Sequence, residues 1–164
     1  MKIKNPPDEM VDVDIIFNLI EIFSIVKFEA EKGVMLNLEK HLPRIDKYLS
    51  QIKGWEKISH ARDLAEFLEE MNQLKSKYLM KLAIKYYKIA NVENPTNDFE
   101  SYDREIANIY LKLGKKREAV KHLKRALKIQ EKCKLGTINY CGPENPEADI
   151  TYIKKEILKI KNGK

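Results

Sequence analysis

Residues 99–134 read FESYDREIANIYLKLGKKREAVKHLKRALKIQEKCK, and they give the clearest indication of the fold class. Gly114 divides it into two runs, 99–113 and 116–134, and each run is long enough to form a helix of several turns. Neither run alternates apolar and polar residues for long, so the pattern favours helices over strands. Two helical runs joined by a short turn at a glycine predict an antiparallel helical hairpin.

The chain repeats part of its sequence after a shift of 36 residues. Six residues recur at the shifted positions, since Glu69, Asn72, Ala83, Lys85, Lys88 and Ala90 fall on Glu105, Asn108, Ala119, Lys121, Lys124 and Ala126. The paired alanines are the informative part of this repeat. Small residues at matched places let the two helices of a hairpin approach closely, where larger side chains would push them apart. A period of this length is typical of stacked helical repeats.

Glycines and prolines divide the rest of the chain into further helical runs. Gly33 ends the first run and Gly54 ends the second, within which Pro43 predicts a kink or a break because proline lacks a backbone N–H. Pro95 follows the fourth run, and Pro146 suits the first turn of the last helix. No stretch predicts a sheet, so the expected fold class is all-α. About seven helices are expected. The first has about 18 residues, is capped by Asp12 or Asp14 and is ended by Gly33, and the others lie over residues 34–52, 57–74, 78–90, 99–113, 116–134 and 146–160.

These helices fall into two expected regions. Residues 1–60 form an N-terminal helical region without an assigned relationship, packed on the remainder of the chain. Residues 61–164 hold the helical-hairpin repeats and end in a capping helix. That last helix carries isoleucines at helical spacing, which predicts one buried face, at Ile150, Ile153, Ile157 and Ile160.

Composition indicates a folded, water-soluble chain, with 43% apolar residues, 34% charged residues and a formal net charge of +6. The most apolar run, Ile15–Phe28, has 14 residues and includes Glu21 and Lys27, so it is too short and too polar to span a bilayer. Prolines and acidic residues directly after the N-terminal lysines do not fit a signal peptide. Cys133 and Cys141 are expected as reduced thiols, and we expect a cytoplasmic location.

The run Ile15–Phe28 is apolar almost all round, with only a narrow polar stripe. A helix of this kind has to be covered on most sides. Two alternatives remain: the helix packs against other parts of its own chain, or it forms the interface of a homodimer.

One stretch resembles the tetratricopeptide repeat family in its spacing of small and large residues, at Ala107, Tyr110, Gly114, Ala119, Leu123 and Ala126. The preceding stretch is similar to the second half of such a repeat, at Ala83, Tyr87, Ala90 and Pro95. The extension after the later repeat is similar to the longer repeats of kinesin light chains. The resemblance implies a right-handed solenoid of helical hairpins that acts as an adaptor or scaffold. Its concave face would hold a peptide or a partner helix of another protein.

The resemblance also implies which side chains contact the ligand. Exposed positions of the first helix of each repeat are expected to do so, at Leu68, Asn72, Lys75, Ser101, Arg104, Asn108, Leu111 and Lys112. An asparagine there can hydrogen-bond the backbone of an extended peptide. Arg104 stands one turn before Asn108 and can grip a carboxylate with two hydrogen bonds. The alternative is that both asparagines only solvate or cap a helix face.

The run from Lys112 to Lys134 is strongly basic, with ten Lys or Arg residues against two Glu. Helical spacing puts Lys121, Lys124, Arg125 and Lys128 on the face opposite the repeat alanines. A solvated face is one interpretation. The alternative is a nucleic-acid-associated protein, or contact with a membrane surface or an acidic protein, although no aromatic residues for stacking on bases are interspersed.

The sequence shows little that predicts catalysis. His41, His60 and His122 lie in separate segments, and none stands at metal-ligand spacing from another ligand. Cys133 has no histidine at a suitable helical offset, and no glycine-rich phosphate loop occurs. We therefore expect no catalytic residue, no metal, no cofactor and no enzymatic activity, with an unrecognised active site in residues 1–60 as the remaining alternative.

Overall fold

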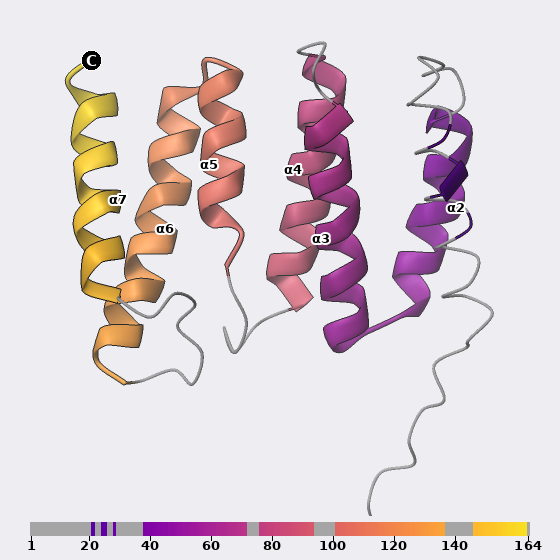
Figure 1. Cartoon of the computed structure of the whole chain (residues 1–164), viewed down its shortest axis with the longest axis horizontal. Helices are drawn as coiled ribbons and strands as arrows, with labels where there is room; N and C mark the ends of the chain where they lie inside the picture. Colours follow the sequence, from indigo (N-terminus) through magenta and orange to yellow (C-terminus); the bar gives the residue numbers. More distant parts are fainter. Residues whose placement is uncertain are drawn as a thin grey trace, which may run out of the picture. The chain divides into compact units, whose positions relative to one another are not determined.

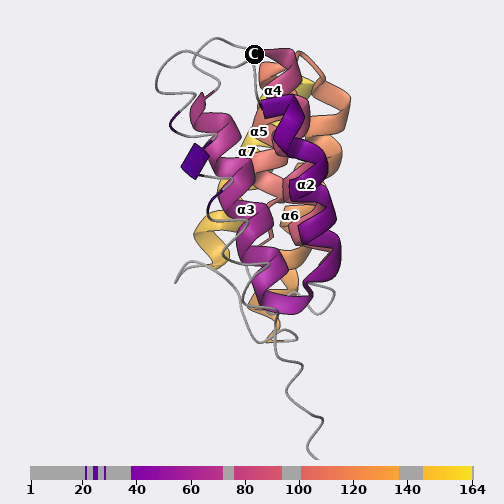
Figure 2. The ribbon, with the colours of Figure 1, turned by 90° about the vertical axis from the view of Figure 1, so that its right-hand side faces the viewer.

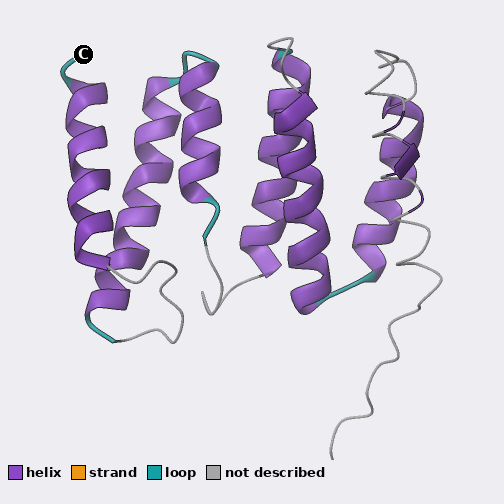
Figure 3. Cartoon of the chain, in the orientation of Figure 1, coloured by secondary structure: helices purple, strands orange, loops and turns teal. Residues whose placement is uncertain are grey.

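The computed structural model describes residues 21, 24, 25, 28, 38–71, 76–93, 101–136 and 146–163. These residues form helices joined by turns and include no strand (Figure 3), which confirms the all-α fold class. The helices are α2 Leu38–Gln51, α3 Gly54–Glu70, α4 Lys77–Glu93, α5 Asp103–Lys112, α6 Lys116–Lys134 and α7 Pro146–Lys161 (Figure 1). The described residues thus form six helices, whereas about seven were expected for the whole chain. The expected first helix, which ends at Gly33 and includes the alternative dimer interface Ile15–Phe28, lies outside the described residues except at four helical positions.

The predicted helix boundaries agree closely with the observed ones in the C-terminal helices and less closely in the earlier helices. The structure confirms the predicted range of α6 and the start of α7 at Pro146. A kink or a break was predicted at Pro43; the break does not occur, because α2 continues through that residue. One proline removes only one helical hydrogen bond, and burial of Leu42, Ile45 and Leu49 on the same helix offsets that loss.

The chain divides into two compact units, Met1–Ile52 and Lys53–Lys164. The sequence-based boundary at residue 60 falls inside α3, which already begins at Gly54. Within the second unit each helix packs against the next one along the chain, from α3 through to α7. Figures 1 and 2 show the axes of these five helices running roughly side by side, so that α3 with α4 and α5 with α6 form two hairpins.

The turn between α5 and α6 shows why a glycine occupies it. Gly114 has φ = +73°, a left-handed conformation that other residues adopt only at a cost. Its N–H donates to the carbonyl of Leu111 at 2.9 Å, and the N–H of Lys115 donates to the carbonyl of Tyr110 at 2.8 Å. This pair of hydrogen bonds is the Schellman motif, which ends a helix by satisfying its last carbonyls.

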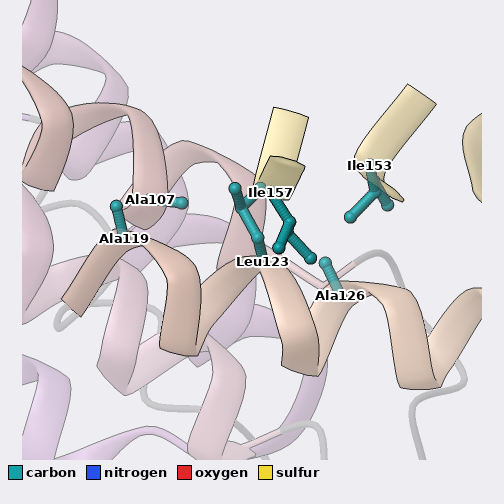
Figure 4. Close-up of a cluster of buried hydrophobic side chains, with 6 residues drawn as sticks. All are labelled: Ala107, Ala119, Leu123, Ala126, Ile153 and Ile157. Carbon is teal, nitrogen blue, oxygen red and sulfur yellow. The ribbon is translucent and has the colours of Figure 1, made fainter. Parts of the chain in front are cut away.

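The repeat alanines lie in the core, as the sequence predicted. Ala83, Ala90 and Ala119 are 0% exposed, and Ala126 is 4% exposed. At the C-terminal end of the unit, alanines of α5 and α6 meet isoleucines of α7 in one cluster (Figure 4), formed by Ala107, Ala119, Leu123, Ala126, Ile153 and Ile157. Because the alanines present almost no side chain, the larger isoleucines fill the space beside α6, and α7 covers this end of the hairpin.

A buried polar pair joins α5 to α6 beside this core. Nδ1 of His122 lies 2.6 Å from Oδ1 of Asp103, and the two side chains are only 4% and 8% exposed. The other carboxylate oxygen of Asp103 accepts a hydrogen bond from the hydroxyl of Ser101 at 3.0 Å. The ring of His122 also stacks on Tyr110, with centroids 5.5 Å apart. These contacts set how α5 lies on α6, and so which side of α5 faces solvent.

Candidate partner-binding surface

Helix α5 carries the predicted ligand-contacting side chains at intervals of one turn. Arg104, Asn108 and Lys112 stand four residues apart, which puts them along one side of the helix. The opposite side of α5 is buried through Ile106, Ala107 and others. The three polar side chains therefore lie on the exposed side of α5, where they can contact the neighbouring helices.

On one side, Lys112 reaches the first helix of the preceding hairpin. Its Nζ lies 3.2 Å from Oε1 of Glu69 on α3. The other oxygen of Glu69 accepts a hydrogen bond from the hydroxyl of Tyr87 at 3.0 Å. Burial, together with the negative charge of Glu69, raises the pKa of Tyr87 far above its usual range, so this hydroxyl remains a donor. Glu69 thus holds a lysine of α5 and a tyrosine of α4 together.

On the other side, Arg104 reaches the last helix. Its Nη1 lies 3.5 Å from Oδ1 of Asp149 on α7, and its guanidinium lies over the ring of Tyr152, 5.2 Å from the centroid. Tyr152 is half exposed, and its hydroxyl hydrogen-bonds Glu156, which raises the pKa of the tyrosine. Arg104 is therefore already in contact with an anion and an aromatic ring of its own chain.

The remaining predicted positions differ in what they do. Asn108 is exposed and makes no hydrogen bond within the described ranges, so its amide is available to a ligand. Ser101 hydrogen-bonds Asp103 at the start of α5, and Leu111 packs against the C-terminal core cluster. The assignment of Leu68 to the surface is wrong, because this side chain is fully buried on the apolar side of α3. Asn72 and Lys75 lie outside the described residues.

A shallow depression adjoins Lys112 on the α3 side. It has a volume of about 370 Å³ and is lined by three carboxylates and a tyrosine, Glu66, Glu69, Glu70 and Tyr87. Sequence reasoning named none of these as ligand-contacting residues, and it also missed Asp149 and Tyr152. The one available signal was that Glu69 recurs as Glu105 in the 36-residue repeat. That recurrence marks a shared position without indicating which side chain it contacts.

The part of the chain described here contains no group of three or more His, Cys, Asp or Glu residues arranged to hold a metal ion. His122 hydrogen-bonds Asp103 through Nδ1, and the thiol of Cys133 is buried at the end of α6. Among the same residues, no helix combines the length and the apolar character needed to cross a membrane.

Comparison of the chain with models of known protein families, with curated proteins and with solved structures finds no match. Its function therefore has to be inferred from the geometry and chemistry of its own side chains.

Proposed function

We propose that this protein is an interaction module of the tetratricopeptide kind, whose hairpins stack as a right-handed solenoid. Its ligand is an extended peptide or a helix of another protein, held along the first helices α3, α5 and α7. One observation carries the proposal: side chains of α5 contact both of the other first helices, α3 through Lys112 and Glu69 and α7 through Arg104 and Asp149. These contacts support a continuous polar surface across three helices, as a scaffold or adaptor needs.

The chemistry of this surface suits a peptide backbone. The amide of Asn108 offers two donors and an acceptor, which match the carbonyl and N–H groups of an extended chain. Arg104 and Lys112 stand one turn to either side and add positive charge for a carboxylate of the ligand. Both cations have partly exposed anionic partners, and ion pairs of this kind contribute only about 0–1 kcal/mol. A ligand carboxylate can therefore replace either partner at small cost.

Peptide selection followed by measured affinities tests the proposal. Peptides selected from a random display library on the immobilised full chain are titrated by calorimetry against the wild type, Asn108→Ala and Lys112→Ala. Loss of one or two hydrogen bonds should weaken binding about 3- to 10-fold for each variant. Lys81→Ala is the matched control, since Lys81 is an exposed lysine on the second helix α4 and should leave the affinity unchanged.

Two results would count against the assignment. One is a set of selected peptides that bind Asn108→Ala and Lys112→Ala as tightly as the wild type. The other is an equal loss of affinity in Lys81→Ala, which would indicate attraction by net charge rather than recognition at the α5 surface.

A further inference from the structure

The exposed side of α6 carries a row of positive charges that the proposed peptide surface does not use. The row comprises Arg117, Lys121, Lys124, Arg125 and Lys128, and every one of these side chains is exposed. The other side of the same helix is buried through Ala119, His122, Leu123, Ala126 and Cys133. The core thus fixes the rotation of α6 about its axis and holds the row toward solvent.

No described residue forms an ion pair or a hydrogen bond with any of these five side chains. Glu118 is the one carboxylate within the span of the row, and it is exposed and also forms no ion pair among the described residues. Two further carboxylates are paired elsewhere, Glu131 with Lys154 at 3.7 Å and Glu147 with Lys134 at 2.9 Å. Within the row, positive charges also stand four residues apart, a spacing at which like charges destabilise a helix. A polyanion laid along α6 would relieve this repulsion.

The dimensions of the row fit a uniformly charged, linear partner. From Arg117 to Lys128 it extends about 17 Å along the helix, since each residue adds about 1.5 Å. Nucleic-acid duplexes carry one negative charge for each ~1.7 Å of their axis, so a duplex can offer a phosphate to each of the five cations. An extended acidic peptide presents at most one charge per residue, or one for each ~3.3–3.6 Å, which is about half the charge density of a duplex.

The residue types in and around the row also indicate which kind of contact such a partner would make. No aromatic side chain interrupts it, so bases have no surface on which to stack. The apolar side chains between Arg117 and Lys128 are buried or, at Val120 and Leu127, partly buried against the core, so none of them projects fully from α6 for insertion into a lipid bilayer. Lysine and arginine without a shaped groove contact phosphates and do not read bases.

We propose that the exposed row of α6 is a sequence-independent binding surface for the phosphate backbone of duplex nucleic acid. It is separate from the peptide surface of α5 and stands whether or not that surface binds peptides.

Salt dependence gives the proposal a quantitative test. With five phosphate contacts, the logarithm of the association constant should fall against the logarithm of salt concentration with a slope of about −4.5. The affinity then drops by about 500-fold between about 50 and 200 mM salt. The measurement is fluorescence anisotropy of the full-length protein with a labelled duplex about 20 base pairs long, which exceeds the row in length.

Two triple variants separate the row from overall charge. K121Q/K124Q/R125Q removes three charges from the row, and should reduce the slope to about −2 and weaken binding at least 10-fold. K40Q/K47Q/K81Q removes three charges from exposed lysines on α2 and α4, and should keep the wild-type slope. All six substitutions are at exposed positions, and circular dichroism checks that both proteins remain folded. An equal loss in the two variants, or an unchanged slope in the first, overturns the proposal.

Additional binding assays distinguish duplex nucleic acid from other anionic partners. A second duplex of unrelated sequence should bind within about twofold, and strong base preference would contradict phosphate-only contact. Vesicles of phosphatidylcholine and phosphatidylserine, and polyglutamate, are tested at the same salt with the same variants. If either binds through the row while the duplex does not, the surface serves a membrane or an acidic protein, and the nucleic-acid assignment is overturned.

Discussion

Replacement of His122 by alanine should destabilise the protein by about 3 kcal/mol, because it removes the partner of a buried carboxylate. The side chains of His122 and Asp103 are only 4% and 8% exposed, with Nδ1 and Oδ1 2.6 Å apart. Breaking a buried pair by deleting one member costs about 3–5 kcal/mol. Loss of the ring stacked on Tyr110 adds about 0.5–1.5 kcal/mol.

Two features of Asp103 should keep the loss of stability in His122→Ala near the lower end of the range of about 3–5 kcal/mol. The hydroxyl of Ser101 still donates to its second oxygen at 3.0 Å. Asp103 is also the first residue of α5, where the helix dipole stabilises a negative charge by about 0.3–1 kcal/mol. The single variant Asp103→Ala leaves a buried imidazole without its acceptor and should cost about 1–3 kcal/mol.

Urea unfolding followed by circular dichroism measures both single variants and the double variant. If the two side chains stabilise the fold through each other, the double variant should lose about 3 kcal/mol, well below the sum of the single losses. The coupling energy should then be about 2 kcal/mol. Lys121→Ala is the control, one residue before His122 and exposed. In high salt, which screens its repulsion from the other cations of α6, the expected change is within about 0.5 kcal/mol. Strictly additive losses would refute the buried pair as the link between α5 and α6.

Three other predictions concern the core, the buried tyrosine and the basic row. Ile153→Ala should cost about 2–5 kcal/mol in urea unfolding, because Ile153 is 0% exposed, whereas partly buried Ile160→Ala should cost less. Burial beside Glu69 raises the pKa of Tyr87, so the stability it contributes is fully present below about pH 10 and is lost as the pH rises further. Above pH ~10 the wild type should lose up to about 1.4 kcal/mol per pH unit more than Tyr87→Phe, and parallel curves would contradict the assignment. Lys121→Gln should stabilise the free protein by about 0.5–1 kcal/mol in low salt, since it removes repulsion from Arg117, Lys124 and Arg125, and the gain should disappear in high salt.

The sequence predicted best those features that depend on neighbours along the chain. The limits of α6, the glycine turn at Gly114 and the buried alanines all follow from local spacing. Leu64, Phe67, Leu68 and Met71 recur at helical spacing, which predicts an apolar stripe on α3, whereas the family resemblance placed Leu68 on the ligand surface. The side chain is buried, because removing a leucine from water stabilises the fold wherever a helix has a covered side.

Contacts between distant residues were not predictable in the same way. Asp103 and His122 stand 19 residues apart on different helices, and periodicity shows which side of a helix is polar without showing what faces it. Arg104 and Asp149 are 45 residues apart. Their contact depends on where α7 lies against the α5–α6 hairpin, and that position is set by the fit of Ile153 and Ile157 against the alanines of α5 and α6. Such three-dimensional packing leaves no signal in a single sequence.

The α5–α6 hairpin brings both proposed surfaces onto one element of the fold. Its two helices share a core through Ala107, Ala119 and the Asp103–His122 pair, so their exposed sides face away from that shared core. A peptide along α5 and a duplex along α6 would therefore touch different side chains of the same rigid unit. Because neither ligand needs the other's contacts, we expect the two to bind together with nearly additive free energies, which is the behaviour an adaptor between a protein and a nucleic acid requires.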